Sequence, residues 1–402
     1  MKADAHIWEF KARFRRHAYG WRSQPAIQRV KQAVSEIKKA ARKDLVLAAD
    51  GAVTLIERLS PALEHVDSSS GAIGTAVNNA IAELVPIIAG APSDPETRGK
   101  WLERLWEAHG ADQIPYIETL ADFWGELCAS KEAASAWADR LVGITRGALS
   151  ADEDLHSYFH GTSACFSALY RAERCEEIVD ILHVDTIWPY KKWAVRALAA
   201  MGRKSEAIQY AESARGPWTP DGQVDAICEE ILLSSGSIDD AYERYGLRAN
   251  RGGTYLATFR AVARKYPHKS AGQILADLVE TTPGDEGKWF AAAKEAGLYD
   301  EALALAKRTP CDPKTLARAA RDFAEQQPAF ALGAGLLALQ WLVQGYGYEI
   351  TGADVWAAYS STMKAAEKSG TVTETRERVK ALVAGEPPGG FVRGILGKDV
   401  GL

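Results

Sequence analysis

The chain has 402 residues, 47% of them hydrophobic and 25% charged, which is typical of folded globular proteins and excludes an intrinsically disordered chain. Its net charge is −5, but residues 1–43 carry twelve Lys or Arg residues against three acids, a balance of +9 that leaves −14 for the rest. This asymmetry excludes an evenly charged surface, and it indicates either an electrostatic partner or the solvated face of an amphipathic helix.

Three helices are predicted in the first part of the chain, over residues 24–49, 51–65 and 72–89. The break at 67–71, Asp-Ser-Ser-Ser-Gly, predicts an N-cap for the third of them, because Asp and Ser side chains accept hydrogen bonds from free N–H groups. An apolar stripe at helical spacing passes through the basic region and favours a packed amphipathic helix; it consists of Ile27, Val30, Val34 and Ile37.

The basic residues of this region support an alternative hypothesis, a segment that contacts the phosphate groups of nucleic acid. The candidate residues are Arg13, Arg15, Arg16, Arg22, Lys38, Lys39, Arg42 and Lys43. Binding of this kind weakens steeply as the salt concentration rises, so it can be tested directly.

Three further helices are predicted within residues 95–149, each with aromatic and aliphatic residues three and four positions apart. No segment alternates with period two, so no sheet is expected. Most of the twelve Trp residues occupy apolar helical positions and are predicted to lie in the core. Trp188 and Trp218 neighbour prolines in breaks, and we expect them to fill corners between helix pairs.

The segment from 151 to 165 holds the best cluster of groups that could carry chemistry. His156 and His160 are four residues apart, so on a helix they would share a face, and Asp152 could complete a metal site. The metalloprotease pattern requires Glu directly after the first His, where Ser157 stands, so a peptidase is excluded. The alternative is a capped helix start with one His exposed and one packed.

No other motif indicates catalysis. Gly161-Thr-Ser-Ala-Cys165 lacks the second glycine of a nucleophile elbow. The glycines at 333, 335, 345 and 347 lack the Lys-Ser/Thr of a phosphate loop, and they are expected to allow close helix packing or to end a helix. We therefore predict no catalytic residue and no cofactor, and favour a non-enzymatic protein.

A repeat begins near residue 160. Gly202, Gly236 and Gly297 each follow small or aliphatic residues by four and five positions and precede an acid and an alanine by four and five. Glycine can end a helix because its backbone adopts left-handed dihedral angles at little cost. An acid favours the start of the next helix because the N-terminal end of a helix is electrically positive. Weaker copies place hinges at Glu173, Tyr266 and Pro328, so the separations between hinges are 29, 34, 30, 31 and 30 residues.

This repeat resembles the tetratricopeptide type at its G-x-x-x-(D/E)-A stretch, although it lacks the regular Trp-x-x-Leu-Gly start. The resemblance implies an all-α chain with a right-handed α-solenoid of antiparallel helix pairs. The whole chain, including the 64–71 stretch Glu-His-Val-Asp-Ser-Ser-Ser-Gly, is also similar to an uncharacterised family of bacterial helical-repeat proteins of unknown function. That similarity implies a bacterial cytoplasmic setting and transfers no catalytic residue.

The predicted organisation has five parts. These are an N-terminal helical region 1–95, irregular helical pairs 96–159, a tetratricopeptide-like array 160–345, capping helices 346–385 and a flexible or docking tail 386–402. The apolar stretch 326–348 is too short to span a membrane comfortably and is predicted to be a buried core helix. The five cysteines form no C-x-x-C pair, which favours a reduced cytoplasmic protein without a membrane segment.

Equivalent positions on successive helix pairs predict a surface for a partner protein, because solenoids bind through such stripes. The charged residues at the equivalent position, six before each hinge, are Arg196, Glu230 and Arg260. Lys192, Arg264 and Arg318 are expected near the same surface. The alternative is a ladder of ion pairs between adjacent helix pairs, without any ligand. A protein-binding scaffold is the leading hypothesis, nucleic-acid binding the second and a metalloprotein the third; the sequence does not predict the oligomeric state.

Overall fold

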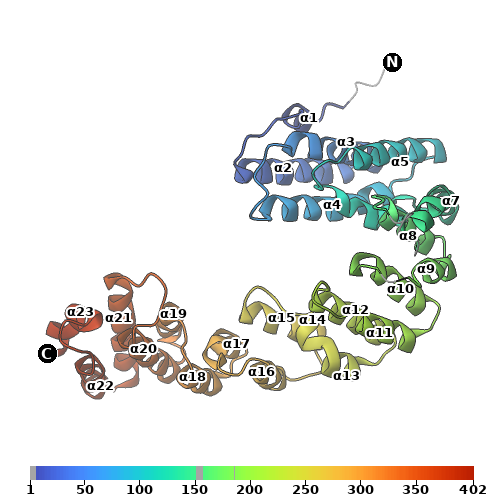
Figure 1. Ribbon diagram of the computed structural model, residues 1–402. Coiled ribbons are helices and arrows are strands. Elements are labelled where there is room, and N and C mark those ends of the chain that lie inside the picture. Colours follow the sequence, from blue (N-terminus) through green and yellow to red (C-terminus); the bar gives the residue numbers. More distant parts are fainter. Residues whose placement is uncertain (1–5, 151–156, 185) are drawn as a thin grey trace. The chain divides into compact units, whose positions relative to one another are not determined.

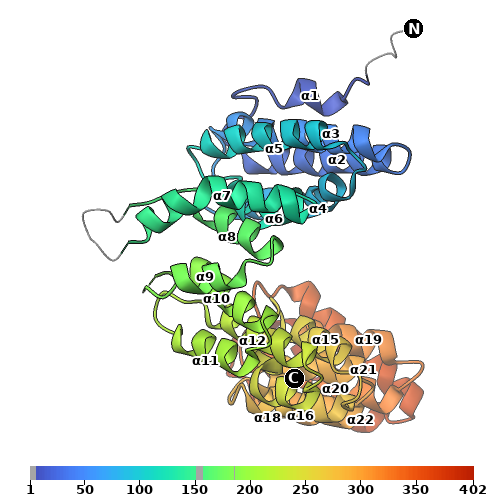
Figure 2. The same cartoon turned by 90° about the vertical axis from the view of Figure 1, so that its right-hand side faces the viewer.

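The structure is a computed structural model that describes residues 6–150, 157–184 and 186–402. All regular secondary structure in these residues is helical, which confirms the predicted all-α class. The chain divides into two compact units, Met1–Pro220 and Asp221–Leu402 (Figures 1 and 2). This boundary falls inside the predicted array 160–345, at the Pro- and Gly-rich break 216–222, whose composition is typical of a boundary between compact units.

The first five helices of unit 1 are α1 (Glu9–Arg13), α2 (Ser23–Ala41), α3 (Leu45–Leu63), α4 (Ala72–Gly90) and α5 (Pro95–Gly110). Two details differ from the prediction. The first break lies at residues 42–44 instead of 50, because Asp44 accepts a hydrogen bond from the Leu47 N–H and caps α3. The cap of α4 is Gly71 with φ +69° and no side-chain bond, since the Asp67 carboxylate accepts from the Ser69 N–H instead.

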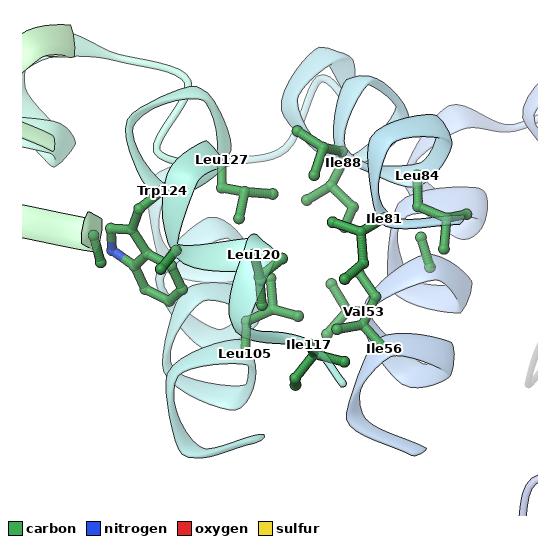
Figure 3. Packing of buried hydrophobic residues seen from close by; sticks show 14 of the residues in the cluster. Val53, Ile56, Ile81, Leu84, Ile88, Leu105, Ile117, Leu120, Trp124 and Leu127 are labelled. Carbon is green, nitrogen blue, oxygen red and sulfur yellow. The ribbon is translucent and has the colours of Figure 1, made fainter. Parts of the chain in front are cut away.

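The core of unit 1 forms where α2, α3 and α4 pack on one another and α5 packs on α3 (Figure 1). Figure 3 shows hydrophobic side chains from α3 and α4 beside those of α5 and the following segment. Those labelled are Val53, Ile56, Ile81, Leu84, Ile88, Leu105, Ile117, Leu120, Trp124 and Leu127. All of them are buried, so the helical periodicity seen in the sequence corresponds to real packing faces.

The C-terminal end of α4 is closed by a buried arginine. The guanidinium of Arg98 on α5 donates to the carbonyls of Ile88 and Ala91, both at 2.6 Å, and more weakly to those of Ala89 and Leu127. Free carbonyls at a buried helix end are costly, and this side chain satisfies several of them at once.

The remaining helices of unit 1 are η1 (Glu118–Phe123), α6 (Trp124–Leu127), α7 (Lys131–Ala148), α8 (Thr162–Arg171), α9 (Cys175–Ile181), α10 (Trp188–Ala200) and α11 (Lys204–Ser213). Each of α8 and α10 packs on the helix that follows it, and α8 also packs on α10. Trp188 is buried as expected at such a corner. Trp218 is 94% exposed, so the prediction that it fills a corner was wrong.

Unit 2 begins with α12 (Asp221–Ser234), α13 (Ile238–Ala241), the π-helical turn η2 (Tyr242–Gly246), α14 (Leu247–Ala249), α15 (Tyr255–Lys265) and α16 (Ala271–Glu280). It continues with η3 (Glu286–Trp289), α17 (Phe290–Glu295), α18 (Tyr299–Arg308), α19 (Pro313–Phe323) and α20 (Pro328–Val343). Last come α21 (Gly352–Ser369), α22 (Val372–Ala384) and α23 (Phe391–Val400). Helix α20 is central, since α18, α19, α21, α22 and α23 all pack on it.

Four predicted hinges adopt one and the same turn. Glu173, Gly202, Gly236 and Gly297 have φ values of +60°, +81°, +78° and +75°. After each of them the next N–H group bonds to the carbonyl five residues earlier, as Arg203 does to Leu198 at 2.9 Å. This bond pattern ends a helix with a left-handed residue. The predicted hinges 266 and 328 differ: Tyr266 has φ −121°, and Pro328 is already the first residue of α20.

Two helices are strongly apolar. Helix α20, in the stretch 326–348, is largely buried, which confirms the expected core helix. Among the described residues α4 is the helix whose length and composition would suffice to cross a membrane, and the sequence analysis had not considered it. In the structure α4 packs on α2, α3 and α6.

The tail after residue 386 is ordered as helix α23. Its apolar residues Val392, Leu396 and Val400 are buried against α20, α21 and α22. Of the two alternatives for the tail, the docking segment is therefore the one that the structure contains.

Candidate interaction surfaces

The predicted partner-binding residues of unit 1 lie at the start and middle of α10. The Lys192 ammonium is 2.6 Å from the Asp122 carboxylate and is mostly shielded from solvent. The Arg196 side chain is exposed, and its guanidinium carbon lies 5.1 Å from the centre of the Trp193 ring. Arg196 is thus held in place by a cation–π contact while its charge stays accessible, whereas Lys192 serves an internal ion pair.

In unit 2 the predicted stripe is only partly realised. Glu230 and Arg264 are exposed on α12 and α15. Arg260 forms two bonds with Glu295 of α17, through its Nε and Nη2 atoms. An ion pair between adjacent helix pairs therefore exists, as the ladder alternative expected, but Arg260 uses Glu295 and not Glu230.

Arg318 lies in a groove of about 350 Å³ between α19 and α21. Its guanidinium is oriented by the Lys314 carbonyl at 3.1 Å and the Thr315 hydroxyl at 3.0 Å. Lys314 and Arg321 flank it on the same face of α19, one turn before and one turn after. The floor is apolar, with Pro313 and Ala317 on α19, Leu342 on α20 and Ala357 on α21.

The carboxylates of the two acids in this groove already interact with groups of the protein. Asp312 accepts hydrogen bonds from the Lys314 and Thr315 N–H groups and caps α19. Asp354 caps α21 and lies 3.6 Å from the Lys314 ammonium. Arg318 makes no ion pair with any described residue, so the groove offers a guanidinium beside an apolar floor.

The basic N-terminal segment is docked on unit 1 instead of extending from it. Trp8, Phe10 and Phe14 are buried against α2 and α3. Arg13 contacts Glu9 and Gln32 at the surface, and Arg16 approaches Glu64 to 4.0 Å. Of the other candidates for phosphate contact, Arg15, Arg22 and Lys43 are exposed.

Lys38, Lys39 and Arg42 line a groove of about 520 Å³ between α2 and α4, together with Lys31. Glu83 is the acid among the lining residues, and it is 2.8 Å from the Lys38 ammonium. The groove therefore carries a clear excess of positive charge, and the structure brings together three of the residues predicted for phosphate contact.

Two of the three residues of the metal hypothesis, Asp152 and His156, lie outside the described residues, so the hypothesis stays a prediction. Within the described part, Ser157, Tyr158 and Phe159, which precede His160, are not helical. Within the described ranges no group of three potential ligands is close enough to hold a metal ion. His160 instead lies among rings, 5.4 Å from His109 and 5.6 Å from Trp106 between centres.

His109 is the unusual member of this aromatic cluster. It is 5% exposed, and neither ring nitrogen has a hydrogen-bond partner among the described residues. Burial, and secondarily the nearby His160, lower the pKa of His109 to about 4. His109 is accordingly buried as the neutral imidazole.

A buried acidic pair on α12 escaped the sequence analysis. Asp225 and Glu229 are 1% and 0% exposed. Arg248 donates twice to Asp225, at 3.1 Å each. Glu229 accepts from Lys265 and Tyr266 at 2.5 Å and from Asn250 at 2.6 Å. These bonds link α12, the segment after the π-helical turn and α15.

The signal for this pair was present in the sequence. Asp225 and Glu229 are four residues apart, on the same face of α12 as Val224, Cys228 and Leu232, all of them buried. Acids within an apolar face are rarely buried without partners. That arrangement marks an internal polar network, although sequence alone does not identify the partners.

A second groove of unit 2, of about 650 Å³, lies between α18 and α22 with α20 as its floor. Its lining is apolar except for Lys307 on α18, Gln340 on α20 and Arg378 on α22. No carboxylate belongs to the lining, and neither cation forms an ion pair within the described part of the chain.

The comparisons with known proteins add no family to these observations, because no protein-family model and no curated protein matches the sequence.

Proposed function

We propose that the protein is a non-enzymatic scaffold of the bacterial cytoplasm that binds another protein, with helix pairs stacked as a right-handed, tetratricopeptide-like α-solenoid. The recurring left-handed turn at Glu173, Gly202, Gly236 and Gly297 supports the repeat organisation. A single helix pair cannot bury its apolar stripe, but stacked pairs can, and their outer faces are then free to bind a partner. The five cysteines, all buried and all among the described residues, form no disulfide bond, which fits a reducing compartment.

The observation that carries this proposal is the groove between α19 and α21. Arg318, which the sequence analysis expected near the predicted stripe, lies there beside Lys314 and Arg321 over an apolar floor. Interfaces typically combine an apolar centre with a charged rim, and arginine is enriched in them. An acidic or neutral segment of a partner protein fits this combination.

The test is affinity capture from bacterial extract with quantitative mass spectrometry. Arg318→Glu/Arg321→Glu should lose the protein that wild type enriches, because it reverses both charges without touching the groove floor. Arg251→Glu, which reverses one charge at an exposed position of the same unit, is the control and should retain the partner. The proposal would be contradicted if wild type and both variants captured the same partner equally, or if wild type enriched no partner at all.

A second candidate function, nucleic-acid binding, is favoured by the groove between α2 and α4. Its cations Lys31, Lys38, Lys39 and Arg42 line one wall, as a phosphate backbone requires. A mobility-shift series with double-stranded DNA and RNA tests it, since each phosphate contact contributes about −0.9 to the slope of log K against log salt for B-DNA.

Lys39→Glu/Arg42→Glu should abolish that binding, while Lys100→Glu on α5 should leave it unchanged. Absence of binding by wild type at low salt would reject this function.

A further inference from the structure

The floor of the groove between α18 and α22 is a stripe of α20 that is only partly covered by the described residues. It consists of Ala329, Leu332, Gly333, Leu336, Leu337 and Gln340. These positions are three and four residues apart, so they form one face that runs for about 17 Å, or three helical turns. Ala329 is exposed, Leu332, Gly333 and Gln340 are partly exposed, and Leu336 and Leu337 form the buried bottom of the groove.

Helix α20 is apolar on every side. A helix with this character is normally enclosed on all sides, whereas a face open to water normally carries polar residues. The other faces of α20 are covered by α19, α21 and α23, and the flanking walls of the open face are apolar too, with Leu303 and Ala304 on α18 and Ala381 and Leu382 on α22. This partly exposed face thus has the composition of a binding surface.

The charges at the two rims define what can cover it. Lys307 on one wall and Arg378 on the other are both exposed, and neither is engaged in an ion pair within residues 186–402. With no carboxylate in the lining, the groove is apolar along its centre and positive on both sides. Leu303 of α18 packs closely on Gly333 of the floor, since a Cβ added to Gly333 would lie 2.7 Å from the Leu303 Cδ1 atom.

We infer that this groove binds an amphipathic α-helix of a partner protein that carries carboxylates on both flanks of its apolar stripe. A helix fits because the floor has the length of three turns and the apolar anchors of such ligands recur at i, i+3, i+4 and i+7. Carboxylates on both flanks meet Lys307 and Arg378. This inference rests on the proposed scaffold function and names the partner class for a second site, apart from the Arg318 groove.

The test uses two labelled synthetic peptides of about 18 residues, long enough to form helix on binding. Both carry leucines at i, i+3, i+4, i+7 and i+11; one has Glu on both flanks of the stripe and the other has Lys. Fluorescence anisotropy measures their binding to the full-length protein. The Glu peptide should bind, and the Lys peptide should bind at least about tenfold more weakly, since like charges face each other across the rims.

Variants locate the site. Lys307→Glu/Arg378→Glu should weaken the Glu peptide by about tenfold and should now bind the Lys peptide. Arg308→Glu/Arg376→Glu carries the same charge change on exposed neighbours outside the lining and should behave as wild type. The exchange of specificity cannot arise from misfolding, and circular dichroism checks that the helix content of each variant is unchanged.

Equal binding of both peptides, or no effect of Lys307→Glu/Arg378→Glu, would overturn the inference. So would concentration-dependent self-association that this variant abolishes in analytical ultracentrifugation, because the groove would then take a second copy of the chain. None of these results bears on capture through Arg318 and Arg321, so the two proposals fail separately.

Discussion

The hydroxyl of Tyr266 donates a hydrogen bond to the carboxylate of Glu229 at 2.5 Å, and both side chains are fully buried. Burial, reinforced by this carboxylate, raises the pKa of Tyr266, so the hydroxyl keeps its proton and remains a donor. The contact joins α15 to α12 inside unit 2 and anchors the polar network described above.

Tyr266→Phe should lower the free energy of unfolding by about 1–3 kcal/mol, the usual cost of leaving a buried polar group short of one partner. Urea unfolding followed by circular dichroism measures it. Tyr255→Phe removes a comparable bond, to Asp285 at 2.6 Å, from a position near the surface, and should cost less. If both variants lost the same free energy of unfolding, the burial of Glu229 would not add to the cost of removing its hydrogen bond, contrary to this prediction.

The stability of unit 1 should decrease as pH falls from about 6.5 towards 4, the pKa to which His109 is lowered in the folded protein. In that pH range the imidazole of His109 is protonated in the unfolded chain but stays neutral in the folded chain, so acidification favours unfolding. The full effect is on the order of 3 kcal/mol. His109→Phe should flatten this part of the stability profile in urea titrations at several pH values. An unchanged profile in the variant would contradict the assignment.

The left-handed turns predict opposite effects at two equivalent hinges. Gly236→Ala should destabilise unit 2 by about 1 kcal/mol, because its φ of +78° strains any residue with a Cβ. Nothing lies near enough to an added Cβ to contribute a clash, so the effect is purely conformational. Glu173→Gly should stabilise unit 1 by up to about 1 kcal/mol, despite losing an exposed ion pair with Lys131. Thermal unfolding of both variants against wild type checks the signs, and two shifts in the same direction would refute this account.

Close packing of α20 on α21 predicts a large effect at Gly335. A Cβ at this position would lie 2.3 Å from the Thr362 hydroxyl oxygen, so Gly335→Ala should destabilise unit 2 by about 1–3 kcal/mol. Gly335→Ala/Thr362→Ala should recover part of the loss. Gly143→Ala, in an exposed helix interior without neighbours, should instead stabilise the protein by up to about 1 kcal/mol. Denaturant midpoints compare the stability of the three variants. An unchanged midpoint for Gly335→Ala would mean that α20 and α21 can move apart without loss of stability.

Sequence was sufficient wherever the deciding interactions are local. Apolar residues at helical spacing identified the helices, and glycine beside small residues identified the turns at Gly202, Gly236 and Gly297, because a left-handed residue is a property of the chain at that point. The same reasoning identified α20 as a core helix. It misplaced the break before α3, where the cap formed by Asp44 outweighed a continuous apolar pattern.

Only the tertiary structure decided which side chains meet. Asp225 and Glu229 lie within an apolar face of α12, but only the structure shows that Arg248 and Tyr266 are their partners. Arg260 pairs with Glu295 although the repeat register suggested Glu230. Lys307 and Arg378 are 71 residues apart in sequence and become the two rims of one groove only because α18 and α22 pack on the same helix. Periodicity determines the face of a helix on which a residue lies, but the partner of that face depends on contacts between distant segments.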